Sequence, residues 1–187
     1  TPAVISIVSE YLSLPDHNKS GKGMVAGGAL SPLIGALYLM PLDKLMEDLQ
    51  ATTGIRYQRY MDDYVIFAPT RHKLRKAIKQ MYSVLDDLKV EVHPKKRFIG
   101  TTRRGFDFLG YWLEPHRPLT PSQVSLTRLI DRSRQLHERT ASITRLRQYV
   151  FRWLQWHRSG LRGLTARSSN FKWVWDYVTN RLEINSS

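Results

Sequence analysis

The sequence contains no cysteine, no long apolar run and few acidic residues for its length. The absence of cysteine excludes a disulfide-stapled scaffold and any zinc or iron–sulfur site with cysteine ligands. Because no apolar run approaches the ~18 residues that a bilayer-spanning helix needs, the sequence predicts no transmembrane helix. The chain starts with neither an initiator Met nor a charged-then-apolar signal peptide. We therefore interpret it as a fragment or a processed chain and expect it in the cytoplasm.

Positive charge is what the sequence has in excess. Its 187 residues include 29 Lys and Arg against 16 Asp and Glu, a net charge of +13, and 42% are hydrophobic. That length and apolar share suit one domain or two small ones with a real core. The charge predicts a polyanionic partner, with nucleic acid first and an anionic membrane surface second. A membrane role is poorly supported, since the basic helices lack a broad apolar face.

The charge is unevenly distributed along the chain. Residues 1–115 have a net charge of +4, whereas residues 116–187 have a net charge of +9 and carry 12 Arg. Two prolines, Pro115 and Pro118, break regular structure between these regions and indicate a short linker. We predict two domains, 1–115 and 116–187. The Arg-rich part is either a solvated helical surface or a phosphate-binding surface, and its one-sided charge favours the second interpretation.

Hydrophobic periodicity predicts an α+β first domain. Helices are expected over 2–12, from an N-cap at Ser31 with a restart at Pro41, and over 71–89. The runs 55–60 and 64–68 are β-prone and flank Met61-Asp62-Asp63, which predicts a hairpin with an acidic turn. Further strands are expected at 90–92 and 106–113.

The second domain is predicted to be a small bundle of three helices. Thr120-Pro121 is expected to open the first helix, and Gly160 and Gly163 separate the second from the third. Of four Trp residues in this part, two are expected to fill the core and the others could stack nucleic-acid bases: Trp153, Trp156, Trp173 and Trp175. The six His show no metal-ligand spacing, so we expect satisfied surface or core histidines.

Asp62 and Asp63 are the residues most indicative of chemistry. Two adjacent carboxylates repel each other, and a divalent cation with oxygen ligands is the usual compensation. Asp is also simply a good turn residue, and a bare Asp-Asp pair is more often explained that way.

Four motifs in order resemble those of reverse transcriptases, and the retron and group II intron-like branch in particular. Tyr60-Met61-Asp62-Asp63 is similar to the catalytic hairpin of that family. The glycine-rich segment 23–33 resembles the loop and helix that precede the hairpin. His93-Pro94-Lys95-Lys96-Arg97 and the segment 106–111 resemble the Pro- and Lys-containing segment and the primer-grip strand pair that follow. The resemblance covers about residues 20–115.

The resemblance implies a polymerase palm over 1–115 and a helical thumb over 116–187. It implies two Mg²⁺, with Mn²⁺ possible, held by Asp62 and Asp63, and a catalytic Lys96 with Lys95 as its rival. A solvated basic turn is the alternative for both lysines. The expected partners are an RNA template, a DNA primer or product, and dNTPs. The remaining implied contacts fall into three groups: nucleotide or template contacts at Gly23, Gly27, Gly28, Tyr60 and Met61; a primer grip at Phe108, Leu109, Gly110 and Tyr111; and phosphate contacts at Arg128, Arg132, Arg145 and Arg152.

Two departures from the family pattern limit what the resemblance implies. The first catalytic Asp of the family lies on a strand before the glycine loop, where this chain has only Glu10 and Asp16, neither on a strand-like run. Val25-Ala26 stands where the family commonly has Pro-Gln. We therefore expect the fingers and the first metal carboxylate to be missing, and the isolated chain to be unable to polymerise.

Two other functions remain open. One is an untemplated DNA-synthesising relative of reverse transcriptases. The other is a maturase-like RNA-binding module that depends on the basic helices and does not need Asp62 and Asp63.

Overall fold

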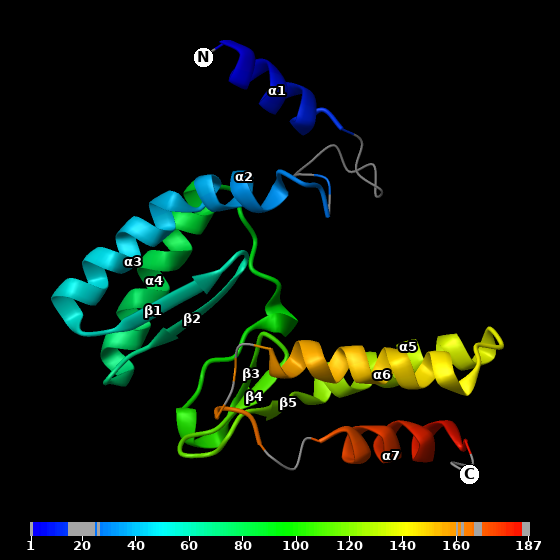
Figure 1. The fold of residues 1–187 in the computed structure, drawn as a ribbon. Helices are drawn as coiled ribbons and strands as arrows, with labels where there is room; N and C mark the ends of the chain where they lie inside the picture. Colours follow the sequence, from blue (N-terminus) through cyan, green and yellow to red (C-terminus); the bar gives the residue numbers. More distant parts are fainter. Residues whose placement is uncertain are drawn as a thin grey trace. The chain divides into compact units, whose positions relative to one another are not determined.

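A computed structural model describes residues 2–14, 25, 27–159, 161, 163–166 and 170–184. The chain divides into two compact units, residues 1–96 and 97–187, and each is described by itself. The fold is α+β, as predicted (Figure 1). The strands of the segment 106–113 group with the C-terminal helices in this division. The palm and thumb boundaries at 115 and 116 stay a prediction.

The first unit is built around one β-hairpin. Its elements are α1 (Pro2–Leu12), α2 (Ser31–Tyr38), α3 (Met40–Thr53), β1 (Arg56–Tyr60), β2 (Asp63–Phe67), α4 (Arg71–Asp87) and the short 3-10 helix η1 (Pro94–Lys96). Helices α3 and α4 pack against each other beside the hairpin (Figure 1). The core consists of apolar side chains from these elements: Leu42, Met46, Leu49, Ile55, Tyr57, Ala77, Met81 and Leu85. The hairpin is therefore fixed on one side by two helices.

Local sequence signals explain most of these boundaries. The apolar spacing predicted a helix over 71–89, and α4 begins after an N-cap at Thr70, whose side chain accepts a hydrogen bond from the Lys73 N–H. A new helix, α3, begins at Met40, directly before Pro41, as the expected restart requires, and its C-cap is Gly54, which has a φ of 73°. Ser31 was predicted as an N-cap, which is wrong: Leu30 takes that position. The Ser31 hydroxyl instead donates to the Val25 carbonyl at 2.7 Å.

The predicted strand at 90–92 is wrong. Lys89 adopts a φ of 55° after α4, and the Val90 N–H donates to the Leu85 carbonyl at 2.8 Å. These features are those of a helix C-terminal turn that reverses the chain. Val90 and Val92 then pack against the core without joining a strand.

The second unit combines a small sheet with three helices. It contains η2 (Thr102–Arg104), β3 (Phe106–Phe108), β4 (Tyr111–Leu113), β5 (Thr120–Pro121), α5 (Gln123–Glu138), α6 (Ile143–Arg158) and α7 (Phe171–Leu182). The three helices confirm the predicted bundle and share a core of Leu129, Ile130, Val150, Leu154, Val174 and Val178. Thr120-Pro121 was predicted to open α5, which is wrong, because these residues pair with β4 as strand β5. The N-cap is Ser122, whose hydroxyl accepts from the Ser125 N–H.

His157 occupies the core of this unit in an unusual way. It is 0% exposed, and its ring stacks with those of Tyr111 and Trp153, with ring centroids 4.3 Å and 5.2 Å away. A satisfied histidine was expected, but within the described residues neither ring nitrogen has a hydrogen-bond partner. Burial lowers the pKa of His157 from 6.5 to about 4, because the charged imidazolium is poorly solvated there.

We expect this histidine to make the second unit acid-sensitive. In the unfolded chain the His157 imidazole binds a proton near pH 6.5, whereas in the folded state it binds one only near pH 4. The free energy of unfolding therefore falls as the pH drops through that interval. From pH 7 to pH 5 the loss attributable to His157 is about 2 kcal/mol. The His157→Phe variant keeps a stacked ring and should lose this dependence in urea unfolding. The same change at the exposed His137 is the control, and equal pH profiles for the wild type and His157→Phe would contradict the assignment.

Candidate functional site

The acidic turn lies at the tip of the β1–β2 hairpin. The strands are antiparallel, with register from Arg56 opposite Phe67 to Tyr60 opposite Asp63. The predicted hairpin is confirmed, with one correction: Asp63 is the first residue of β2, so the connection consists of Met61 and Asp62 alone. Met61 has a φ of 56°, in the left-handed region that a two-residue connection between strands often requires. The side chains of Tyr60, Met61, Asp62 and Asp63 are all exposed.

Asp62 and Asp63 are suitable ligands for a hard divalent cation. Within the described part of the chain, neither carboxylate forms an ion pair, so both retain their oxygen lone pairs for another partner. Carboxylate oxygens are the ligands that Mg²⁺ and Mn²⁺ prefer. No group of three or more His, Cys, Asp or Glu side chains that could hold a metal occurs among the described residues. The pair therefore fits part of a metal site.

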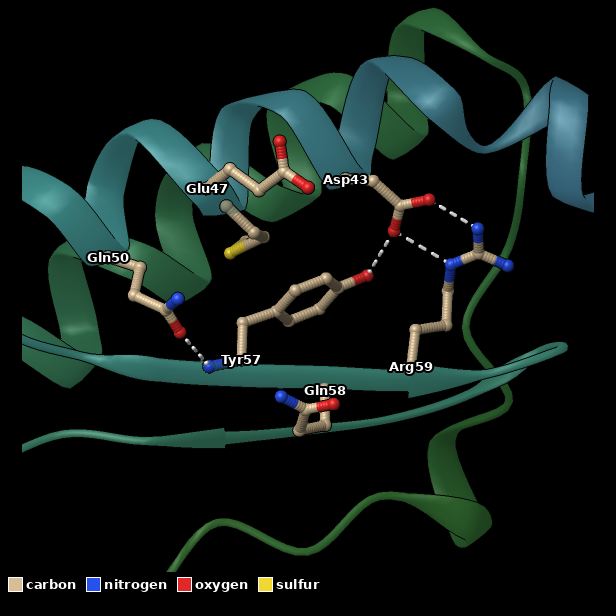
Figure 2. A pocket seen from close by; sticks show the side chains of 7 residues that line it. Asp43, Glu47, Gln50, Tyr57, Gln58 and Arg59 are labelled. Carbon is tan, nitrogen blue, oxygen red and sulfur yellow. Dashed lines mark hydrogen bonds and ion pairs between the residues drawn. The ribbon is translucent and has the colours of Figure 1, made fainter.

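A partly buried ion pair supports the strand that leads into the acidic turn (Figure 2). Arg59 of β1 binds Asp43 of α3 through two hydrogen bonds, one of them from Nε to Oδ1 at 2.8 Å. The Tyr57 hydroxyl donates to the same Oδ1 at 2.9 Å. The hydrogen bonds from Arg59 hold the pKa of Asp43 below its usual value, and burial together with Asp43 raises the pKa of Tyr57.

A hollow of about 310 Å³ lies beside this ion pair. Its lining comes from α3 and β1: Asp43, Met46, Glu47, Gln50, Tyr57, Gln58 and Arg59 (Figure 2). The Gln50 side chain closes one side by accepting a hydrogen bond from the Tyr57 N–H at 3.0 Å. Polar side chains therefore tie α3 to β1 along the length of this hollow.

Sequence reasoning missed Asp43, Tyr57 and Arg59. The signal was present, because residues two apart lie on the same face of a strand, and this places Arg59 with the buried Tyr57. A charged side chain on a buried face needs a partner. The partner itself could not be found from the sequence, since Asp43 is 16 residues away on a helix.

The glycine-rich loop is only partly described. Gly23 and Ala26 lie outside the described residues. Gly27 has a φ of 75°, which favours glycine. A Cβ at Gly28 would overlap the hydroxyl of Tyr11, which in turn contacts the Ser31 hydroxyl at 2.7 Å. The structural requirement for glycine at this position is thus close packing against α1.

The predicted catalytic lysine lies on η1. Lys96 is exposed, and its backbone N–H donates to the His93 carbonyl at 3.0 Å. The side chain of its rival, Lys95, is outside the described part of the structure. Among the described residues, no hydrogen bond or ion pair joins Lys96 to Asp62 or Asp63.

The predicted primer grip forms a second tight hairpin. The strand expected over 106–113 is two strands, β3 and β4, because Leu109 and Gly110 have φ values of 52° and 82° and reverse the chain. Phe108 and Tyr111 pair across this turn. The Tyr111 hydroxyl donates to the His157 carbonyl at 2.6 Å, which anchors the hairpin to α6.

Four arginines form what we call the basic face: Arg128 and Arg132 of α5, and Arg145 and Arg152 of α6. All four are exposed. The positions within each pair are four and seven residues apart, so each pair lies on one side of its helix. Arg132 is close enough to Tyr149 of α6 to counteract the rise that burial causes in the pKa of Tyr149. Tyr149 lies four residues after Arg145 and three before Arg152 on α6, so we expect the two helices to present their arginines on a shared surface.

Several other arginines of the second unit are already engaged. Arg117 and Arg134 pair with Glu114 at 3.5 Å and Asp131 at 3.7 Å. Arg147 and Arg181 lie over aromatic rings. No salt bridge to the basic face occurs within the described residues. The basic face is therefore the better candidate for phosphate contacts.

The tryptophans divide as expected. Trp153 and Trp175 pack against the helical core. Trp156 is 63% exposed and Trp173 is 41% exposed. Trp156 follows Arg152 by four residues on α6, which places an exposed aromatic ring beside the basic face.

Comparison with known proteins bears on the first 113 residues. A family model described as reverse transcriptase (RNA-dependent DNA polymerase) matches residues 5–113, which is more than half of the chain. The matched range includes the glycine-rich loop, the acidic turn and the β3–β4 hairpin. No curated protein matches the chain. None of the described helices has both the length and the apolarity needed to cross a membrane.

Proposed function

Because the chain belongs to the reverse transcriptase family, we propose that it supplies the palm carboxylates and the thumb of an RNA-directed DNA polymerase, with residues 1–115 as palm and 116–187 as thumb. The observation that supports this most is the acidic turn. Its two exposed carboxylates lie at the end of a hairpin packed on α3 and α4, inside the range that matches the family. A rigid support of this kind is what a metal-dependent site requires.

Asp62 and Asp63 would hold Mg²⁺, or Mn²⁺, through their carboxylate oxygens. When bound, such ions would supply activation of the attacking primer hydroxyl and charge neutralisation at the leaving pyrophosphate. The protein's own contribution is to fix these oxygens and to place the neighbouring Tyr60 and Met61 against the nucleotide. Lys96 would supply a proton or positive charge to the pyrophosphate. The glycine loop at Gly23, Gly27 and Gly28 would approach the nucleotide or template base closely.

The second unit would hold the nucleic acid. The β3–β4 turn, with Phe108, Leu109, Gly110 and Tyr111, is proposed as the primer grip. The basic face would bind phosphates of the RNA template and DNA primer, since arginine forms paired hydrogen bonds with phosphate oxygens. Such contacts fix the register of the duplex without reading its sequence.

A maturase-like RNA-binding module is the second candidate. The observation that favours it is the +9 net charge of residues 116–187 together with the exposed basic face, which has no carboxylate partner among the described residues, because these features would bind RNA without Asp62 and Asp63. In this case an RNA-dependent phenotype would survive replacement of both aspartates.

Primer extension with the natural protein, including any sequence its gene adds to these 187 residues, tests the proposal. We expect dNTP incorporation that requires Mg²⁺ and an RNA template, with a product complementary to the template. Equal synthesis without a template would favour an untemplated relative, and RNA binding without any synthesis would favour the binding module. The 187-residue chain alone is expected to give no product.

A further inference from the structure

Arg59 connects the acidic turn to α3. Arg59 binds Asp43 with two of its nitrogens, and its third, Nη1, donates to the Met61 carbonyl at 2.6 Å. The guanidinium therefore bridges the helix and the backbone of the turn. The Arg59 side chain is 12% exposed, so its bonds to Asp43 are partly shielded from water, whereas its bond to the Met61 carbonyl lies at the exposed end of the hairpin.

The residue that accepts this bond has an unfavourable backbone. Met61 has a φ of 56°, and the left-handed conformation is unfavourable for an L-residue with a side chain. The charge-assisted hydrogen bond from Arg59 to the Met61 carbonyl helps to stabilise this conformation. The Met61 carbonyl belongs to the peptide bond that joins Met61 to Asp62. The orientation of this peptide therefore determines the direction in which the Asp62 side chain points.

We propose that Asp43 and Arg59 are positioning residues for the acidic turn: they hold the Met61 carbonyl, and through it the Asp62 carboxylate, in the orientation that metal binding needs. The inference rests on the proposed polymerase function. Neither residue contacts substrate in this account. Their effect is transmitted through the backbone of Met61, and a displacement of about 1 Å in a reacting group can cost about 10²-fold in rate.

Tyr57 provides a control within the same cluster. Its hydroxyl donates to Asp43, and within the described part of the chain no hydrogen bond joins it to the acidic turn. The Tyr57→Phe variant thus removes one hydrogen bond to Asp43 and leaves the bridge from Arg59 to Met61 in place. If the cluster has only a structural role, changes at Tyr57 and Arg59 should affect kcat similarly. If Arg59 positions the acidic turn, only the change at Arg59 should lower kcat strongly.

The test compares Arg59→Lys with Tyr57→Phe in the natural protein. A lysine keeps the charge but cannot bind both Asp43 oxygens and the Met61 carbonyl at once. We expect Arg59→Lys to lower kcat about tenfold or more, raise the Mg²⁺ concentration for half-maximal rate, and leave KM for dNTP within about twofold. Tyr57→Phe should lower Tm and leave kcat within about twofold. Amide hydrogen exchange at Asp63, which pairs with Tyr60 directly after the turn, should accelerate in Arg59→Lys only.

Each outcome bears on the inference. Equal losses of kcat in the two variants, or a normal kcat and Mg²⁺ dependence in Arg59→Lys, would overturn it while the polymerase function stands. If Arg59→Lys fails to fold, Asp43→Asn takes its place, since it weakens the anchor but retains a side-chain oxygen acceptor, and the same rate and Mg²⁺ effects are expected. A wild-type protein without synthesis would reject the proposed function instead, and hydrogen exchange at Asp63 would still decide whether Arg59 orders the turn.

Discussion

Replacing Asp62 by Asn should lower template-directed DNA synthesis about a thousandfold or more, and Asp63→Asn should do the same. The change keeps the shape of the side chain and removes its negative charge, which is what binds a divalent cation. Removing a group that stabilises the transition state electrostatically commonly lowers kcat by a factor of about 10²–10³. Loss of a metal ligand also weakens metal binding, which lowers the rate further. Stability should change little, because both side chains are exposed and unpaired in the described structure. Primer extension over a range of Mg²⁺ and Mn²⁺ concentrations measures the effect.

The first unit offers a matched control for this experiment. Asp86 and Asp87 are a second adjacent acidic pair, exposed at the C-terminal end of α4. Their replacement by Asn removes the same charge from the same unit without touching the acidic turn. Rates within about twofold of wild type are expected for this control. Comparable losses from both pairs would indicate a general charge effect and would argue against a metal site at Asp62 and Asp63.

Neutralising the basic face should weaken nucleic-acid binding strongly. The variant replaces four arginines with Gln: Arg128, Arg132, Arg145 and Arg152. Each phosphate contact releases a counterion, and the slope of log K against log salt is about −0.9 per contact on a duplex. If all four contacts are lost, the slope should become shallower by three to four, and the affinity at low salt should fall about 10²-fold or more. Fluorescence anisotropy with a labelled RNA–DNA duplex between 50 and 200 mM salt, concentrations over which such contacts are resolved, provides the measurement.

Four engaged arginines of the same unit serve as the charge-matched control. Arg117 and Arg134 have carboxylate partners, and Arg147 and Arg181 lie over aromatic rings. Their replacement by Gln removes the same total charge. We expect a clearly smaller change in the salt slope, because these guanidinium groups are committed to protein contacts. Equal slopes for the two variants would show that net charge, and not the basic face, determines binding.

The sequence predicted elements well where periodicity or turn chemistry was local. The hairpin around Met61-Asp62-Asp63 and the helix over 71–89 are present because their apolar positions alternate or recur at helical spacing. Errors arose where a backbone reversal was not marked by a typical turn dipeptide. Lys89 and Leu109 both adopt positive φ. At Lys89 the chain turns where a strand over 90–92 was predicted to start, and at Leu109 the chain reverses and divides the strand predicted over 106–113 into two.

The candidate site was only half accessible to sequence reasoning. A short motif identified Asp62 and Asp63, since the two carboxylates are adjacent in the chain. The bridge from Asp43 through Arg59 to Met61 depends on how α3 packs on β1, and helix packing is not encoded in any local pattern. The same reason hid the unpaired nitrogens of His157, which become buried only when α6 packs against β4.

Metal binding by the acidic turn is the central claim, and Mn²⁺ titration followed by NMR tests it most directly. Paramagnetic Mn²⁺ broadens the amide signals of residues near its site, and this effect is visible even when binding is weak. We predict that the amides of Asp62 and Asp63 broaden at lower Mn²⁺ concentrations than those of Asp86 and Asp87, and that added Mg²⁺ reverses the broadening. Broadening that begins at Asp86 and Asp87, or that leaves Asp62 and Asp63 unaffected, would contradict the account.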